Sequence, residues 1–422
     1  MLTKPRQALW QDLQTARRLG VWPSVPVRGG PIKDATLRFF TMHPLRDRTA
    51  IAGVGYTKQG KLPGETPITL ATQALKRALD DCGLRKDQID GLLTMPGTTS
   101  PEGTRNYLRF GEAVGINPRY LGSKYMGGGT AGAILHEAAM AVNAGFANYV
   151  ACVFGDTAAT GGTRFNEAAG WGDSWGIWGF MSAAANSAIT ASRHMALYGT
   201  TSRQLGEIAV ACRYHASLNP DAVMRKPMTV DDHQASRFIV EPLRLFDCCL
   251  ISDGAVCVIV TTAERARDLK QPVVRIAGMG QAYVTENMGR EDWWYVPHQK
   301  LAVEDAYAMA GVGPKDIDVC QLYDNFTSSV LVWFEHAGFC KVGEAGSFVE
   351  NGRIRLGGEL PVNTAGGNLS ESYMEGWLHI VEGVKQMRGQ CGPRQVEGAE
   401  VCLVTGRGQS LNCANATILR KD

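Results

Sequence analysis

Two short stretches of the 422-residue sequence come close to known chemical motifs, and each lacks a residue that its chemistry needs. Residues 55–61 read GYTKQGK after an apolar run, as a loop that binds phosphate through its backbone amides would. The next residue is Leu62, where such a loop needs the hydroxyl of a serine or threonine to hold magnesium. We therefore interpret this stretch as a plain loop.

The second stretch begins like the helical zinc-protease motif, in which two histidines four residues apart bind the metal. His136 and Glu137 open it, but Met140 stands where the second histidine should be. A metal site is therefore not expected, and His136 is predicted to be a structural or interface residue. A dinucleotide-binding fingerprint with its acidic partner is also absent from the sequence.

The cysteines show no ligand or redox pattern. There are 11 of them without a CxxC pair, and the closest two are the adjacent Cys248 and Cys249. This predicts mostly buried thiols in a reduced, cytoplasmic protein. We find no secretory signal and no apolar run approaching about 18 residues, so no membrane span is expected. A net charge of +2 without a long basic run argues against nucleic acid as the main partner.

The elements that must position any reactive side chain are predicted by an internal repeat. Residues 51–55 read IAGVG, and residues 276–280 read IAGMG. Residues 74–90, ALKRALDDCGLRKDQID, match residues 302–318, AVEDAYAMAGVGPKDID. In each copy an amphipathic helix ends on a glycine, which can adopt the left-handed conformation. A polar turn and then an apolar strand follow.

A third, weaker correspondence starts from glycines. A helical stretch over 127–144 opens on three glycines, and one over 366–388 opens on two. Strand-like segments follow at 149–155 and 401–406. Three matches in the same order indicate a duplication, and each half alternates strand and helix, as parallel sheets do.

The repeat predicts the division of the chain. We expect an N-terminal extension over 1–48, a first half over 49–268 and a second half over 269–422. The first half carries an insert at about 157–247, which has no counterpart in the second.

These features resemble the thiolase superfamily, above all the thiolases of the sterol-carrier-protein type and their aldolase relatives. The likeness covers roughly residues 48–420. It implies an α/β fold of two similar halves, with mixed five-stranded sheets layered around central helices in the order αβαβα. Its most specific segments are FDCCLISDGAVCVIVTTAERA (246–266), YDNFT (323–327), NTAGGNLSESYMEGW (363–377) and VTGRGQS (404–410).

A thiolase needs four reactive groups, and the resemblance implies that this chain has lost all four. A thiolase carries a nucleophilic cysteine at the start of the glycine-led helix, two histidines and a second cysteine. The corresponding positions fall on Gly129, Tyr323, Tyr373 and about Val404. Cys402 is close to the last position but does not restore the nucleophile. Thiolase chemistry is therefore not expected, because an acyl-cysteine cannot form.

Tyrosines at the two histidine positions resemble the pattern of thiolase-like aldolases. These enzymes cleave the carbon–carbon bond of a β-hydroxyacyl-CoA, giving a ketone or aldehyde and a shorter acyl-CoA. Family members act on steroid side chains, with relatives in bile-acid and aromatic side-chain degradation. The resemblance implies that Tyr323 takes the proton of the β-hydroxyl and Tyr373 protonates the enolate carbon.

Several neighbours are expected to contact the substrate or its oxyanion. Amides of the first glycine turn could stabilise an oxyanion, and the second pair of glycines would allow close approach of the backbone. These residues are Gly128, Gly129, Asn325, Gly366 and Gly367.

Two interpretations stay open for each of the aromatic and acidic neighbours. Glu375 either tunes Tyr373 or meets solvent, and Asp324 orients the loop or caps a turn. Trp171, Trp175 and Trp178 line an acyl pocket or belong to an interface or the insert core, and the same choice applies to Trp293 and Trp294.

The resemblance also implies partners. No cofactor is expected beyond the coenzyme A that the substrate carries. A homodimer is expected, together with a small partner protein built from a zinc ribbon and an OB-fold barrel. Two other functions stay open: a thiolase-type acyltransferase without the usual cysteine, and a non-catalytic protein that binds acyl-CoA or sterol. The two tyrosines favour the lyase.

Overall fold

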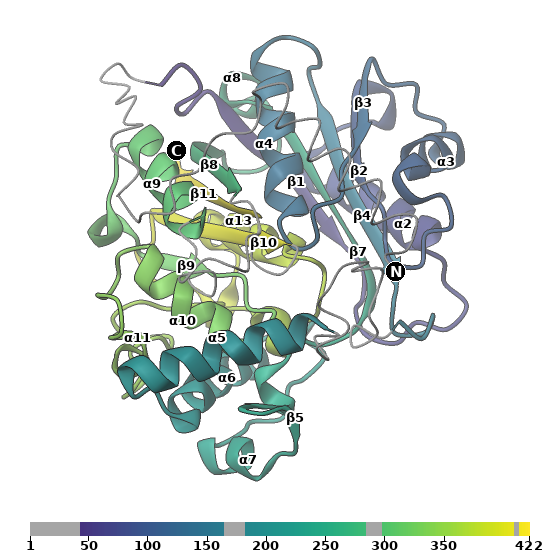
Figure 1. The fold of residues 1–422 in the computed structure, drawn as a ribbon. Helices are drawn as coiled ribbons and strands as arrows, with labels where there is room; N and C mark the ends of the chain where they lie inside the picture. The colour runs from purple at the N-terminus through teal and green to yellow at the C-terminus, as the bar shows by residue number, and fades with distance from the viewer. Residues whose placement is uncertain (1–42, 164–181, 284–297, 409–412) are drawn as a thin grey trace, which may run out of the picture. The chain divides into compact units, whose positions relative to one another are not determined.

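The computed structural model describes residues 43–163, 182–283, 298–408 and 413–422. These residues belong to the compact unit His43–Asp422, whose fold follows the predicted repeat (Figure 1). The first copy consists of β1 (Thr49–Tyr56), α2 (Pro67–Cys82), β2 (Gly91–Met95), α3 (Asn106–Val114), β3 (Tyr120–Ser123), α4 (Thr130–Asn143), β4 (Val150–Thr157), β7 (Asp253–Thr262) and α8 (Ala263–Ala266).

The second copy repeats this order with extra helices. It consists of β8 (Val274–Tyr283), α9 (His298–Ala310), β9 (Val319–Gln321), α10 (Thr327–His336), α11 (Ala345–Phe348), α12 (Gly367–Ser370), α13 (Trp377–Arg388), β10 (Val401–Gly408) and β11 (Cys413–Lys421). Between β4 and β7 the first copy carries an insert. The insert contains α5 (Ala183–Tyr198), α6 (Ser202–Ser217), α7 (Val230–Ala235), β5 (Phe238–Val240) and β6 (Leu243–Arg244).

The two copies share their strand topology. The main sheet has the order β3-β2-β4-β7-β1-β8-β11-β10-β9. β2 pairs with β4 in parallel, and β7 is antiparallel to both β4 and β1. In the same way β9 pairs with β10 in parallel, and β11 is antiparallel to both β10 and β8. β1 and β8 then join the copies in antiparallel, so the copies share one continuous sheet.

The edge of the second copy differs from the expected five-stranded sheet. At the position that β3 occupies in the first copy, only a single parallel bridge joins Val362 to Cys320 of β9. Pro361 precedes the bridge and has no amide proton to donate. Asn363 follows it in the left-handed region, at φ 52°. A strand cannot extend in either direction from this bridge, so the described part of the second copy contributes four strands.

Three apolar cores confirm the layered arrangement. α2 and α3 cover one face of the first copy's strands. α4 and α13 pack against the opposite face of the strands from both copies, forming the central layer. α9 and α10 cover the remaining face of the second copy, together with the insert helices α5 and α6 (Figure 1). Adjacent strand residues alternate between layers, as Ile276 faces the central core and Ala277 the outer one.

The predicted helix ends are observed in both copies, with one correction. Gly83 and Gly311 follow α2 and α9 in the left-handed conformation, at φ 78° and 69°. The stretch predicted as one helix over 366–388 is instead interrupted. α12 ends after four residues and α13 begins only at Trp377. Left-handed residues at positions 375 and 376 break the helix between them.

Candidate active site

The two tyrosines singled out from the sequence lie against each other. The hydroxyl oxygens of Tyr323 and Tyr373 are 3.1 Å apart. Tyr323 stands two residues after the end of β9, and Tyr373 stands in the break between α12 and α13. Tyr323 is 1% exposed, whereas Tyr373 is half-buried, so Tyr373 is the more exposed residue of the two.

Glu375 completes this pair, and the solvent-facing alternative for it is wrong. The Tyr323 hydroxyl donates to Oε2 of Glu375 at 3.4 Å, and Tyr373 also donates a hydrogen bond to this carboxylate. Glu375 is 6% exposed. Its backbone lies in the left-handed region at φ 51°, which is uncommon for a residue with a side chain and recurs at functional sites.

Burial shifts the proton equilibria of all three groups. It raises the pKa of Tyr323 and of Tyr373 well above the ordinary value, and the charge of Glu375 adds to both shifts. Burial also raises the pKa of Glu375 to about 7, against hydrogen bonds from the two phenols that lower it. Both tyrosines are therefore neutral near pH 7, and the carboxyl is the group that titrates there.

The absence of a side chain at Gly128 leaves room for the Tyr323 hydroxyl. A Cβ atom at this position would lie 1.9 Å from the Tyr323 hydroxyl oxygen, and the carbonyl of Arg407 would lie 2.5 Å away. A Cβ at Gly129 would instead face Cys413 Sγ at 3.1 Å. Of these two glycines, Gly128 is thus the one that faces the Tyr323 hydroxyl. The space is filled by the phenol.

The glycine turn offers fewer free amides than expected. The Gly129 amide donates to the Met126 carbonyl at 3.3 Å, and the Thr130 amide donates to the Gly127 carbonyl at 2.9 Å. These two amides hold the turn together, so the expectation that Gly129 stabilises an oxyanion is not supported by its geometry.

Gly366 and Gly367 approach protein atoms on the side where a Cβ would stand, and their contact with substrate stays a prediction. A Cβ at Gly367 would lie 2.1 Å from Oδ2 of Asp324, and one at Gly366 would lie 2.6 Å from Cβ of Ala216 on α6. Asp324 is fully buried and accepts hydrogen bonds from the amides of residues 368 and 369 and from Nε2 of His379. Asp324 therefore fixes the loop that follows β9 to the start of α12.

Asn325 is tied to a buried cation that the sequence analysis missed. The Ser329 hydroxyl donates to Oδ1 of Asn325 at 2.7 Å, and Nη1 of Arg407 donates to Oγ of Ser329 at 3.1 Å. Burial lowers the pKa of Arg407 to about 10, and the nearby phenol of Tyr323 opposes this shift. Arg407 lies in the VTGRGQS segment, but nothing in the sequence marked it as facing the tyrosines.

The thiols near the site are not activated. Cys249 is half-buried, and burial followed by the charges of Cys248, Asp324 and Glu375 raises its pKa well above the ordinary value. Cys402 is fully buried in the central core, so it offers no accessible replacement nucleophile. His136 is likewise a core residue: Nε2 is 2.8 Å from the Thr417 hydroxyl oxygen, and burial lowers its pKa to about 4.

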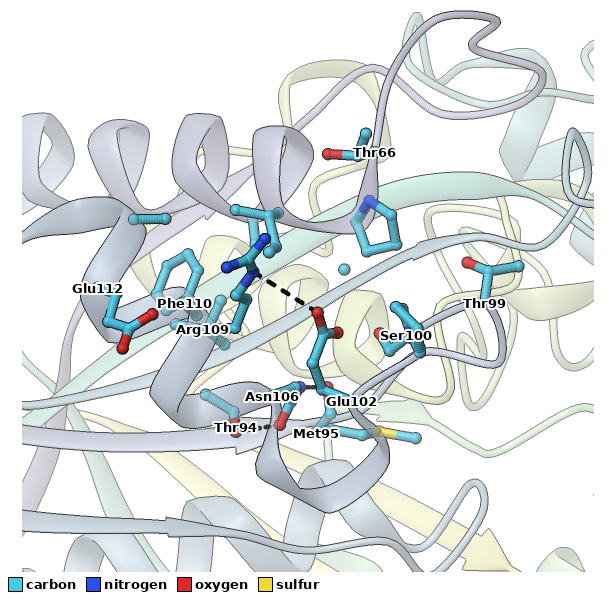
Figure 2. A pocket seen from close by; sticks show the side chains of 17 residues that line it. Thr66, Thr94, Met95, Thr99, Ser100, Glu102, Asn106, Arg109, Phe110 and Glu112 are labelled. Atoms are coloured by element: carbon cyan, nitrogen blue, oxygen red, sulfur yellow. Dashed lines mark hydrogen bonds and ion pairs between the residues drawn. The ribbon is translucent and has the colours of Figure 1, made fainter.

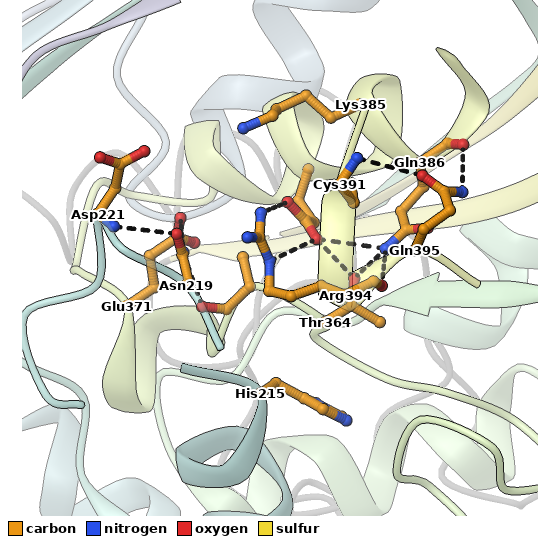
Figure 3. Close-up of polar contacts among 12 residues, drawn as sticks. His215, Asn219, Asp221, Thr364, Glu371, Lys385, Gln386, Cys391, Arg394 and Gln395 are labelled. Carbon is orange, nitrogen blue, oxygen red and sulfur yellow. Dashed lines mark hydrogen bonds and ion pairs between the residues drawn. The ribbon is translucent and has the colours of Figure 1, made fainter. Parts of the chain in front are cut away.

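Figure 3 shows a buried polar network around Arg394 and, beside it, the contacts of Glu371 at the start of the loop that carries Tyr373 and Glu375. Arg394 pairs with Glu382 of α13 at 3.0 Å, and the Thr364 hydroxyl donates to Oε1 of the same carboxylate at 2.9 Å. At the start of the loop, Nδ2 of Asn219 donates to Oε1 of Glu371 at 3.1 Å. The start of the loop is thus anchored to the insert, and α13, which follows the loop, is tied to Thr364 before α12.

A separate cavity of about 710 Å³ lies on the outer face of the first copy, between α2 and α3 (Figure 2). An ion pair between Arg109 and Glu102, 3.7 Å apart, lines it. The cavity shares no residue with the tyrosine site. Its wall residue Thr99 nevertheless donates its hydroxyl to Oδ1 of Asp156 at 2.7 Å, and Asp156 is a charge that raises the pKa of Glu375.

Other expectations concern metals, membranes and tryptophans. Within the ranges that the structure describes, no group of three or more His, Cys, Asp or Glu residues could hold a metal ion. None of the described helices is long and apolar enough to cross a membrane. The five tryptophans at positions 171, 175, 178, 293 and 294 lie outside the described residues.

Comparison with known proteins identifies the family. Residues 280–421 match the family described as thiolase C-terminal domain-like. A 17-hydroxy-3-oxo-4-pregnene-20-carboxyl-CoA lyase from Mycobacterium tuberculosis is 40% identical over 86% of this chain and 96% of its own length. A steroid side-chain-cleaving aldolase from Thermomonospora curvata is 36% identical over 87% of this chain and 97% of its own length.

Solved structures show the same relationship. The Ltp2-ChsH2(DUF35) aldolase superposes with a TM-score of 0.81 at 35% identity, over 90% of this chain and 99% of that one. Human mitochondrial 3-ketoacyl-CoA thiolase shares the fold, with a TM-score of 0.67 at 14% identity over 90% of this chain and 100% of that one. The chain therefore belongs to the thiolase superfamily, within its aldolase branch, and is a carbon–carbon lyase.

Proposed function

We propose that this lyase performs retro-aldol cleavage of a β-hydroxyacyl-CoA whose acyl group is a steroid side chain. The products are a ketone and a shorter acyl-CoA. The observation that carries the proposal is the direct contact of two neutral phenols with one buried carboxylate, where the superfamily's acyl-transfer chemistry would need a thiolate. The steroid is favoured because two relatives that match most of this chain are named for steroid substrates.

The proton transfers of this reaction suit the site. Cleavage removes the proton of the β-hydroxyl, releases the carbonyl product and leaves a thioester enolate, whose carbon must then be protonated. In the proposed arrangement Tyr373 contacts the substrate, because it is the more exposed phenol. Tyr323 supports it from the space beside Gly128.

We propose two kinds of partner. The name of the related Ltp2-ChsH2(DUF35) structure contains a second component, which supports a small zinc-ribbon and OB-fold partner for this chain. A homodimer is supported by the edge strand β3, where Leu121 is 47% exposed, and by the nearby Met140 on α4, which is 50% exposed.

The test is to produce the full chain with its small partner and offer the complex a panel of thioesters. Mass spectrometry should detect a ketone together with the shortened acyl-CoA from a steroid β-hydroxyacyl-CoA. Aromatic and aliphatic β-hydroxyacyl-CoA substrates report on the acyl group. Faster thiolysis of a 3-ketoacyl-CoA than cleavage of any β-hydroxyacyl-CoA would favour the acyltransferase instead. Light scattering with and without the partner measures the assembly.

A further inference from the structure

We propose that Glu375 stores the substrate's proton during the reaction, receiving it from the hydroxyl through Tyr373 and returning it through the same phenol pair to the enolate carbon. The inference rests on the proposed retro-aldol function. It differs from the catalytic roles expected from the sequence, in which one tyrosine alone is the base and the other alone is the acid.

The three groups form a closed triangle. The two hydroxyl oxygens are 3.1 Å apart, the Tyr323 hydroxyl is 3.4 Å from the Glu375 carboxylate, and Tyr373 donates to that carboxylate as well. One carboxylate therefore contacts both phenols. A proton that enters the triangle at Tyr373 can reach the carboxylate directly and can leave it again through either hydroxyl.

The backbone is adapted to place this carboxylate. Glu375 occupies the left-handed region at φ 51°, and the next residue, Gly376, follows at φ 87°. A Cβ at Gly376 would lie 3.3 Å from the Tyr323 ring. A residue with a side chain in this conformation is strained, and the strain persists only where the surroundings hold it. Here the surroundings are the two phenols and the start of α13.

The phenols are poor proton acceptors by themselves. Each would have to become a buried phenolate next to a carboxylate, and burial together with that charge disfavours the phenolate. With Glu375 as the final acceptor, neither tyrosine has to ionise for longer than the transfer itself. The other titratable groups that face this carboxyl are Asp156 on β4, Tyr125 before the glycine turn, and Cys249.

The step balances without another reactant. The substrate O–H bond breaks as Tyr373 accepts that proton and passes its own to Glu375. The electron pair of the O–H bond forms the carbonyl, and the pair of the cleaved carbon–carbon bond forms the enolate. Glu375 then returns a proton through a phenol to the enolate carbon. The carboxylate and both phenols are regenerated, with no net gain or loss of protons.

The pH dependence of activity is the first test. Glu375 must be a carboxylate to accept a proton, so kcat/KM should fall about tenfold per pH unit as the pH drops below about 7. Glu375→Gln should lower kcat at least about 100-fold and remove this acidic limb of the pH profile, the fall of kcat/KM below about pH 7. Glu375→Asp keeps an ionisable group on a side chain one methylene shorter, so it should restore part of the rate and the acidic limb.

A matched control uses another buried carboxyl on the same loop. Burial raises the pKa of Glu371 well above the ordinary value, so Glu371→Gln replaces a neutral group by a neutral isostere. It should keep the acidic limb of the wild type. A limb that survives in Glu375→Gln, or a rate within a fewfold of the wild type, would overturn the inference while leaving the proposed cleavage intact.

A stability measurement separates the inference from the proposed function. Folding raises the pKa of Glu375. The protonated carboxyl therefore stabilises the folded protein at pH values below the pKa that Glu375 has in the unfolded chain, and this stabilisation is lost as the pH rises towards about 7. The Tm of Glu375→Gln minus that of the wild type should therefore increase between pH 5 and pH 8. A flat difference overturns the inference whatever the activity. A wild-type complex that cleaves no β-hydroxyacyl-CoA overturns the proposed function.

Discussion

The two copies of the repeat place different side chains at the same point. With the spacing of 228 residues between the copies, Met95 at the end of β2 corresponds to Tyr323 just after β9. Met95 is buried in the central core, and its sulfur accepts a hydrogen bond from the indole of Trp377 at 3.5 Å. Tyr323 instead directs its hydroxyl to Gly128, Tyr373 and Glu375.

This difference shows how a duplicated scaffold becomes an asymmetric site. Apart from the missing counterpart of β3 in the second copy, the pairing of the strands and the central helices correspond between the copies. The first copy contributes space, through Gly128, and a distant charge, through Asp156. The second copy contributes every group in contact in the triangle. Neither copy alone contains both the phenol and the space for it.

The strongest test of this asymmetry removes the phenol hydroxyls. Tyr373→Phe should lower kcat/KM by about 10²–10⁴-fold, because it removes the group that meets the substrate. Tyr323→Phe should also lower it, by less, since Glu375 keeps its contact with Tyr373. Steady-state cleavage rates of the two variants measure this. Near-normal rates in both would contradict any catalytic part for the second copy's tyrosines.

The buried ion pair of the second copy offers the next test. Arg394→Met leaves Glu382 as a buried, unpaired charge and should lower the free energy of unfolding by about 3–5 kcal/mol. The exposed pair between Lys76 and Asp80 in the first copy provides the control, because Lys76→Met should cost less than about 1 kcal/mol. Denaturant unfolding compares the two. Equal losses would mean that the buried pair contributes no more to stability than the exposed one.

The contribution of the first copy is tested at Gly128. Gly128→Ala places a methyl group on the Tyr323 hydroxyl and should displace it, which would lower kcat about 100-fold. Gly111 lies in α3 with its nearest neighbour at 3.5 Å, so Gly111→Ala should leave the rate unchanged. Cleavage rates and Tm are measured for both. An active Gly128→Ala variant would show that the space is not needed.

The smallest effect is expected at Cys249. Its thiol is neutral near pH 7, so Cys249→Ala should change kcat less than about twofold. If this variant is inactive and the substrate labels the wild-type thiol, the site acts through a nucleophilic cysteine.

The sequence predicts the scaffold well because the scaffold repeats. The glycines that end α2 and α9 and the apolar strands that follow them are local patterns, and local patterns survive in a sequence. The position of the tyrosine pair follows from the resemblance to thiolases. What could not be predicted depends on the left-handed residues at 375 and 376, which interrupt the expected helix and turn Glu375 inward.

Arg407, and the contact of Gly128 with Tyr323, escaped prediction for a related reason. Both act through atoms that are close in space and distant in sequence, and nothing in their own neighbourhoods signals this. Gly128 and Gly129 look equivalent in a run of three glycines. The contact of the phenol with Gly128 and not with Gly129 depends on the paths of β9 and β10.

The fit of Tyr323 against Gly128 also makes the two positions interdependent. Any residue larger than glycine at 128 would overlap the phenol hydroxyl, since even a Cβ would lie 1.9 Å from it. A side chain at 128 and the present position of the phenol therefore exclude each other. Substitutions at the two positions should consequently be non-additive, although the residues belong to different copies of the repeat.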